Sequence, residues 1–345
     1  MVKELITLNS GKVNEFLHHF DANSYGTNRM LSLFLGEFDD GSVLIDCGSS
    51  LDINKILRYF KKNNIPLSTC KYLVTTHHHF DHVGGMWKLY EEVKKHNPNV
   101  KILTNSITKE LLNDYKLHLK RGKRTYGDLT GVMKPIEDCA FQIIEPNTDF
   151  KTSFDNHDND LVFHVNDSEV KLVIYHTPGH TPDHQCPAFI IEGKLAFIHF
   201  GEAVGTIYHS SELVTMPTSM PIFYNNEKYM ETLNNLEKLT PLSAGFGHFG
   251  LVRGRKNIKK LLLEHKSFMI EFREKIIKYY SEKPETKYVL NKISPFLLHR
   301  TDLPMDHSPV LTGISLGIVY GMMTSLGYRE IPKEELVYYK KFYTS

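Results

Sequence analysis

Four candidate metal ligands occur within six residues of one another, at His77, His79, Asp81 and His82. The apolar residues 70–75 before them predict a strand, and in an extended segment alternate side chains face the same side. His77, His79 and Asp81 would then point one way, and the turn that follows would bring in His82. Imidazole and carboxylate together suit divalent zinc, iron or manganese. A surface histidine cluster, the alternative, does not explain the strand before the motif or the glycine pair after it.

Together these residues resemble the HxHxDH signature of the metallo-β-lactamase superfamily, which includes glyoxalase II and acyl-homoserine lactonases. By the same resemblance, His180 lies in a Thr-Pro-Gly-His-Thr segment that supplies the third histidine ligand. His248, between small glycine-containing segments, matches the final ligand. Asp46, in Asp-Cys-Gly, resembles an aspartate that supports the metal site from behind, with a turn at the strand end as the alternative role. His184 is expected to have a supporting role.

Glu202 departs from the family pattern, in which a Gly-Asp pair supplies a carboxylate that bridges two metals. Glutamate keeps the carboxylate and adds one methylene. Glu202 could therefore bridge two ions, bind one of them or displace an ion. The sequence predicts a metal site and leaves the number of ions open.

The resemblance implies a centre of two divalent ions, with zinc first and iron or manganese as alternatives. One ion would be held by His77, His79 and His180 and the second by Asp81, His82 and His248, with Glu202 between them or to one side. Such a centre implies a hydrolase whose metal-bound hydroxide cleaves an ester, lactone, thioester or phosphoester of a small molecule. Asp81 would steer the proton, and Tyr208 would donate a hydrogen bond to a substrate oxygen, with packing as its alternative role.

Two other functions are compatible with this ligand set. Iron on the same fold would make a redox enzyme that handles oxygen, nitric oxide or persulfide. His79 counts against this alternative, because flavodi-iron relatives commonly carry glutamate there, and Glu202 partly restores it. A non-catalytic metal-bound sensor is the other. Nucleases of the superfamily carry an inserted domain before the last histidine, and the interval from His180 to His248 is too short for one.

The surrounding pattern predicts a layered α/β protein, because strand-like and helix-like segments alternate through the first half of the chain. Asp39-Asp40-Gly41 predicts a hairpin turn between two strands in residues 28–46. The resemblance implies a four-layer αββα sandwich in residues 1–252 and a helical extension in residues 253–345, which in glyoxalase II helps to form the substrate pocket. Residues 201–221 resemble a little-characterised archaeal and bacterial branch.

Residues 106–120 are expected to form a helix, followed by a basic, glycine-broken segment at 121–127. That segment is either a wall of the active-site mouth, with Lys123, Arg124 and Tyr126 as weak candidates for substrate contact, or a solvated loop. His209, beside Tyr208, could also donate a hydrogen bond to the substrate, with packing or solvent exposure as the alternative. Four polar residues of the extension could reach the site, although structural roles are favoured for them: His299, Arg300, Asp302 and His307.

Residues 310–326 are apolar but short for a membrane span and interrupted by polar residues, so they predict a buried helix. Gly313, Gly317 and Gly321 recur every four residues and leave one helix face nearly bare, which would let another helix approach closely. That neighbour could lie in the same chain or in a second copy. A homodimer through the helical extension is therefore one expectation.

The charge balance is neutral, with 41 Lys and Arg against 40 Asp and Glu among 345 residues. No basic footprint for nucleic acid or anionic membrane is visible, so we expect a small-molecule substrate. The first eight residues lack the features of a secretory signal, and we expect a cytoplasmic protein. Four scattered cysteines, without a C-x-x-C pair, predict reduced thiols.

Overall fold

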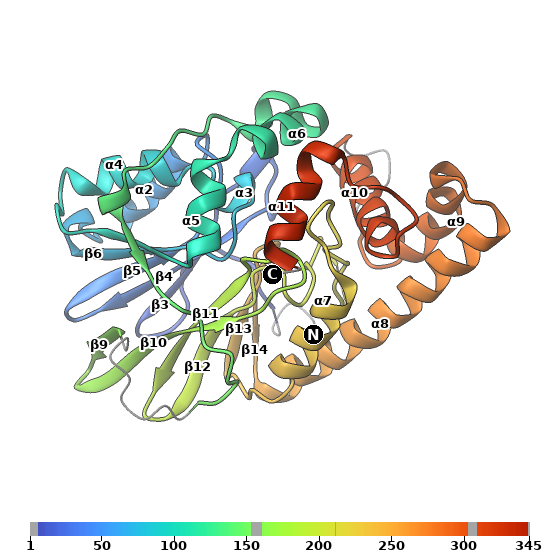
Figure 1. The fold of residues 1–345 in the computed structure, drawn as a ribbon. Coiled ribbons are helices and arrows are strands. Elements are labelled where there is room, and N and C mark those ends of the chain that lie inside the picture. The colour runs from blue at the N-terminus through green and yellow to red at the C-terminus, as the bar shows by residue number, and fades with distance from the viewer. Residues whose placement is uncertain (1–5, 153–160, 211, 303–308, 344–345) are drawn as a thin grey trace.

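The computed structural model contains two seven-stranded sheets that pack face to face (Figure 1). It describes all residues except 1–5, 153–160, 211, 303–308 and 344–345. The N-terminal sheet has the order β2 (Gly11–Lys12), β3 (Leu17–Asp21), β4 (Ser32–Phe38), β5 (Gly41–Ile45), β6 (Cys70–Val74), β7 (Lys101–Thr104) and β8 (Phe141–Ile143). The C-terminal sheet has the order β1 (Ile6–Thr7), β14 (Leu251–Arg253), β13 (Ser243–Gly245), β12 (Lys194–His199), β11 (Gln185–Ile191), β10 (Ser168–His176) and β9 (Leu161–Val165).

Strands β4 and β5 are apolar on both faces because both faces are covered. Phe34 and Ile45 point into the core between the sheets, whereas Leu33, Leu35 and Leu44 point into a second core under the helices. This arrangement follows from the two-residue period of a strand, which sends neighbouring side chains to opposite faces. Strand β5, which leads into Asp46, is thereby held from both sides.

Helices cover the outer face of each sheet, which completes the predicted αββα sandwich (Figure 1). On the N-terminal sheet these are α2 (Ile53–Lys62), α3 (Phe80–Val83) and α4 (Met86–Lys94). On the C-terminal sheet they are α7 (Asn226–Leu236) and α8 (Arg255–Glu282). Further helices follow as α9 (Thr286–Leu298), α10 (Pro309–Ser325) and α11 (Lys333–Tyr343). The division of the chain at residue 252 stays a prediction, although α8 shares one hydrophobic cluster with β13.

The predicted hairpin and the predicted strand before the histidine motif are both confirmed. The hairpin between β4 and β5 pairs Phe38 with Gly41, as the Asp-Gly signal predicts, and β6 precedes the histidine motif. The helical character predicted for residues 106–120 is confirmed, but the chain forms two helices there, α5 (Ser106–Asn113) and α6 (Lys116–Tyr126). The expectation of a helix break at 121–127 is wrong, because α6 continues to Tyr126.

Packing explains the helix at Gly122, which is buried in the middle of α6. A Cβ atom there would lie 3.1 Å from the ring of Phe80, so glycine allows the helix to lie close to the metal motif. Helix α9 was not predicted from the sequence. It contains Pro295, a residue that usually disfavours the interior of a helix. Its buried Val289, Ile293 and Leu297 nevertheless follow helical spacing.

The glycine face of α10 packs against other parts of the same chain. A Cβ atom at Gly313 would lie 3.1 Å from Thr125 of α6, and one at Gly317 would lie 2.7 Å from the sulfur of Met220. The Ser219 hydroxyl donates a 2.7 Å hydrogen bond to the Ile318 carbonyl. The close neighbour expected for this face is therefore the loop before α7 together with α6. A homodimer stays a prediction.

Two further sequence expectations concern membranes and cysteines. Within the part of the chain that the structure describes, none of the helices is both long and apolar enough to cross a membrane. All four cysteines are free thiols, as predicted, and Cys47, Cys70 and Cys186 are buried.

Gly321→Ala tests whether α10 depends on its close approach to the loop. A Cβ atom at residue 321 would lie 1.9 Å from the carbonyl oxygen of Ser219, so the backbone must move. Alanine favours a helix by about 1 kcal/mol over glycine. Overpacking typically costs about 1–3 kcal/mol, and a clash with backbone that cannot rotate away lies at the upper end of that range. We expect a net loss of unfolding free energy in urea denaturation. Thr312→Ala, on the exposed side of the same helix, should change it by less than about 0.5 kcal/mol, and equal stability of both variants would contradict the packing argument.

Candidate metal centre

Three imidazoles and one carboxylate converge at the end of β6. The inward nitrogens are His77 Nε2, His79 Nδ1 and His180 Nε2, which lie 3.0, 3.1 and 3.3 Å from one another. Ligand atoms about 2.05 Å from a tetrahedral zinc ion stand roughly 3.3 Å apart, so these separations fit a single ion. His180 comes from the turn after β10, and Pro178 and Gly179 shape that turn.

A second group lies beside the first and contains Asp81, His82 and His248. The Nε2 atoms of His82 and His248 are 3.2 Å apart, and Asp81 Oδ2 lies 3.5 Å from His248 Nε2. His82 enters from α3, as the expected turn requires. The structure thus places all the sequence-predicted ligands in two adjoining groups, with the same division that the resemblance implies.

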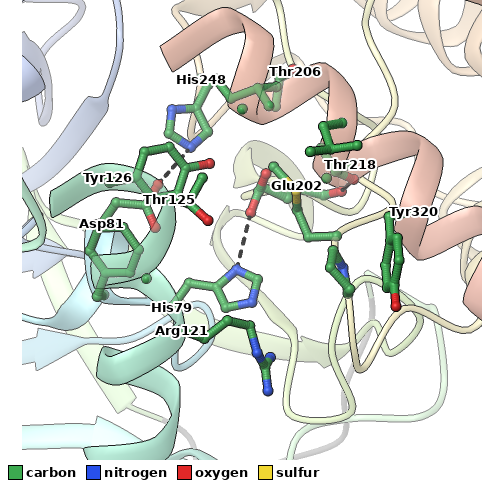
Figure 2. A pocket seen from close by; sticks show the side chains of 18 of the residues that line it. His79, Asp81, Arg121, Thr125, Tyr126, Glu202, Thr206, Thr218, His248 and Tyr320 are labelled. Carbon is green, nitrogen blue, oxygen red and sulfur yellow. Dashed lines mark hydrogen bonds and ion pairs between the residues drawn. The ribbon is translucent and has the colours of Figure 1, made fainter. Parts of the chain in front are cut away.

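Glu202 lies between the two groups. Its Oε2 atom is 2.7 Å from His180 Nε2 and 3.2 Å from His77 Nε2 in the first group, and 3.6 Å from His82 Nε2 in the second. Figure 2 shows its carboxylate directed toward His79, with His248 and Asp81 on the other side of the cavity. The longer side chain therefore brings an oxygen to the boundary between the groups, where a bridging ligand would lie.

Asp46 supports both groups from behind. Its carboxylate accepts hydrogen bonds from the Thr76 amide at 2.8 Å and the Thr76 hydroxyl at 2.7 Å, and it lies 3.0 Å from His82 Nδ1. Because the Thr76 hydroxyl donates to Asp46, it accepts from His77 Nδ1 at 3.0 Å. Asp46 adopts φ of +58°, a left-handed conformation that is uncommon outside glycine. The expected supporting role of Asp46 agrees with this geometry.

Backbone carbonyls fix two further imidazoles. His180 Nδ1 donates to the Thr218 carbonyl at 2.6 Å, and His248 Nδ1 donates to the Met30 carbonyl. In His77, His82, His180 and His248 the Nδ1 proton is therefore directed away from the site, and the Nε2 lone pair faces inward. Lone pairs that converge in this way repel one another unless a cation lies between them, so the donor set fits divalent metal.

The electrostatics favour a cation at the site, although His82 must first lose a proton. Burial alone would lower the pKa of His82, but the hydrogen bond to Asp46 and the charge of Asp81 outweigh it and raise the pKa to about 9, so a metal ion would displace that proton. Burial, with neighbouring His82 and His79, holds the pKa of His77 well below its usual value, so its imidazole is neutral. Burial alone would raise the pKa of Glu202, but His180, His77 and His79 more than offset this and hold it well below its usual value. For Asp81, burial is likewise outweighed by His248 and His82, and the pKa falls to about 2. Both carboxylates are therefore ionised at neutral pH.

Sequence reasoning missed a group of residues that hold the Glu202 loop. The Thr218 hydroxyl donates to the Glu202 carbonyl at 2.8 Å, and the Tyr229 hydroxyl lies 3.3 Å from that carbonyl and 2.8 Å from His265 Nε2. The Glu202 amide donates to His184 Nε2 at 3.1 Å, which gives His184 the supporting role expected of it. No local pattern marks Tyr229 or His265, which come from α7 and α8 and meet the loop only in the folded chain.

A cavity of about 460 Å³ opens over the two groups, and His79, Asp81, Glu202 and His248 form part of its wall (Figure 2). Its other sides are α6, α10 and the loop at residues 217–221. The segment at 121–127 therefore does form a wall of the site, through Tyr126 and its neighbours in α6. A cavity of this size suits a small molecule.

Tyr208 is buried at this wall, and its ring stacks on His248 with centroids 5.9 Å apart. Burial and the nearby Tyr126 and Asp81 hold the pKa of Tyr208 well above its usual value. The hydroxyl is therefore protonated at neutral pH and can donate a hydrogen bond.

Other candidate residues lie elsewhere. Lys123 and Arg124 are exposed and are not part of the cavity wall. His209 Nε2 is 2.9 Å from the Asn28 carbonyl, outside the cavity. Among the described residues of the extension, those expected to be structural likewise do not line the cavity, namely His299, Arg300 and Asp302. His307 lies outside the described residues.

Comparisons with known proteins agree with the fold. The sequence model of the metallo-beta-lactamase superfamily matches residues 31–248. An archaeal metallo-β-lactamase superfamily protein from Sulfolobus tokodaii is 20% identical, with a TM-score of 0.59 over 90% of this chain and 98% of that one. A β-lactamase domain protein from Burkholderia ambifaria is 15% identical, with a TM-score of 0.61 over 96% and 97% of the two chains. A search of curated proteins found no match.

Asp46→Asn tests the support behind the metal ligands. The amide cannot accept all the hydrogen bonds that the carboxylate accepts, and the charge that steadies His82 is lost. Loss of such an outer contact typically lowers metal affinity about 10–100-fold, and we expect that loss in a zinc competition titration.

Asp183→Asn is the matched control for Asp46→Asn. Asp183 is also buried and binds a histidine, since it lies 2.9 Å from His78 Nδ1, but His78 is not a predicted ligand. We expect this variant to be less stable yet to bind zinc with nearly wild-type affinity. Equal losses of zinc affinity in the two variants would contradict a specific role for Asp46.

Proposed function

The chain belongs to the metallo-β-lactamase superfamily, and on that premise we propose that it is a hydrolase that depends on two divalent metal ions. The proposed reaction cleaves an ester, lactone, thioester or phosphoester bond in a small molecule. One observation carries this proposal: the imidazole and carboxylate groups of four chain segments converge at the wall of a cavity that a small molecule can enter.

The proposed ligand sets are His77, His79 and His180 for one ion and Asp81, His82 and His248 for the other, with the Glu202 carboxylate between them. When bound, such ions lower the pKa of a water molecule toward neutrality and polarise a carbonyl or phosphoryl oxygen. We assign zinc ahead of iron and manganese because imidazoles outnumber carboxylates in the set.

The chain's own residues would then handle protons and orientation. The Asp81 carboxylate is ionised at neutral pH and lines the cavity, so it would orient the attacking water and steer its proton toward the leaving group. The protonated Tyr208 hydroxyl can donate to the oxygen that gains negative charge during attack. Both residues line the cavity, so both can contact a substrate.

An iron-dependent redox activity is the second candidate. The Glu202 carboxylate favours it, because an oxygen ligand beside several imidazoles also suits iron. An iron-loaded protein without hydrolytic activity would place this candidate first.

His180→Ala should abolish hydrolysis and leave the fold intact, because His180 provides a direct ligand and its turn is held by other contacts. We expect activity on a panel of esters and lactones to fall by more than about a hundredfold, since even outer-contact losses reach that size. Chelation of the wild-type protein should have the same effect, and zinc should restore it. Exposed His96→Ala is the control, and full activity with normal metal content in His180→Ala would remove this residue from the site.

Tyr208→Phe should lower kcat by about 10²–10³-fold, the usual cost of losing a donor to a developing oxyanion. The ring that stacks on His248 remains, so metal content should not change. Tyr115→Phe, outside the cavity wall, serves as the control. A Tyr208→Phe enzyme with normal kcat would leave this tyrosine only a packing role.

A further inference from the structure

We infer that the substrate carries an uncharged, apolar group beside its scissile bond, and that this group fills the part of the cavity between α6 and α10. The inference rests on the proposed function, because it names the class of molecule on which the metal centre would act.

The wall away from the metal ligands is apolar. Tyr126 of α6, Met220 and Pro221 of the loop, and Ile314 and Leu316 of α10 line it, and hydroxyl groups are present at Thr125, Thr286 and Tyr320. The bare backbones of two α10 glycines lie among them and add space rather than polar groups. Such a surface gains free energy when an apolar group displaces water from it, and it offers little to a polar one.

The charged residues of the cavity wall also favour an uncharged group on the substrate. Among the described residues that line the cavity, and apart from the predicted metal ligands, Arg121 carries the one permanent charge. Its guanidinium forms an ion pair with Glu335 of α11, and in Figure 2 it points away from Glu202. His118 accepts a 3.2 Å hydrogen bond from the Phe80 amide, so that ring nitrogen carries no proton. A second anionic group on the substrate would therefore have no uncompensated partner in this wall.

Among the described residues of the cavity wall, one buried hydroxyl lacks a hydrogen-bond partner. The Thr206 hydroxyl is buried, lines the cavity and has no hydrogen-bond partner among the described residues. Two backbone hydrogen bonds to Met216, at 2.7 and 3.0 Å, hold Thr206 in place. A buried hydroxyl without a partner is costly, so a substrate oxygen that accepts from it would stabilise the complex. The cavity thus matches a molecule with a neutral polar end at the metals and an apolar end toward α10.

Gly317 sets the depth of the apolar part. A Cβ atom there would lie 2.7 Å from the sulfur of Met220, and both residues line the cavity. A larger side chain at this position would therefore occupy space or push Met220 into it. The length of the apolar group that binds should depend on residue 317.

Methyl ketones test the inference directly, because they resemble esters but are not hydrolysed. On the zinc-loaded protein, affinity measured by NMR titration should rise about fourfold per methylene from 2-butanone to 2-octanone, which corresponds to about 0.8 kcal/mol for each buried methylene. The ion 7-oxooctanoate has the same chain length but ends in a carboxylate, and it should bind at least tenfold more weakly than 2-octanone. Equal or tighter binding of 7-oxooctanoate, or affinity that does not change with chain length, would overturn the inference.

Three variants sharpen the test. Gly317→Val should remove the gain between 2-hexanone and 2-octanone, whereas Thr312→Val, with the same new side chain on the exposed face of α10, should keep it. Thr206→Val should weaken all the ketones by a similar factor. If Gly317→Val does not fold, Leu316→Asp at a partly exposed wall position serves instead and should weaken 2-octanone at least tenfold. Unchanged affinities in the folded variants would contradict this assignment of the wall.

The two proposals fail in different ways. Ketone binding that depends on chain length, without hydrolysis of any ester, lactone or thioester, would support this inference and contradict the hydrolase. Metal-dependent hydrolysis together with ketone affinities that ignore chain length would support the hydrolase and overturn this inference alone.

Discussion

Five imidazoles and two carboxylates share a small, largely buried volume, and this crowding is the constraint on which the rest of the structure depends. Buried polar groups need partners, and imidazole lone pairs that face one another need a cation between them. The chain meets the first need with hydrogen-bond acceptors on the outer side of the histidine rings. Asp46 accepts from His82 Nδ1 and from the Thr76 hydroxyl, which in turn binds His77. The Thr218 and Met30 carbonyls accept from Nδ1 of His180 and His248. A divalent metal would meet the second. The left-handed conformation of Asp46 becomes understandable as part of this support.

The C-terminal helices belong to the site as well as to the sandwich. Tyr229 of α7 and His265 of α8 hold the loop that carries Glu202, so the carboxylate between the two ligand groups depends on residues outside the histidine motif. Helix α10 adds the wall opposite the predicted metal ligands, and its glycines let it come close to α6 and the loop at 217–221. The αββα layers thus supply the proposed metal chemistry, and the later helices shape the space in which a substrate would lie.

Local sequence signals located the candidate ligands but not their surroundings. His77 to His82 form a compact motif after a strand, and His180 and His248 were matched by the resemblance of their short segments to the family. Thr76, Thr218 and Tyr229 gain their roles only from contacts between distant segments, which no single-sequence pattern records. Helix α6 shows the same limit, because a glycine that weakens a helix locally is favoured there by its contact with Phe80. Fold class follows from periodicity, but the cavity follows from packing.

Metal stoichiometry tests the central claim most directly, because it depends on the converging donors and not on the choice of substrate. Protein purified without added metal or oxygen would be analysed by mass spectrometry for its metal content and then titrated with zinc. The account predicts about two tightly bound divalent ions per chain, one for each ligand group. Saturation at one ion would contradict the two-ion centre, and the absence of tight binding after titration would contradict the assignment of these residues as metal ligands.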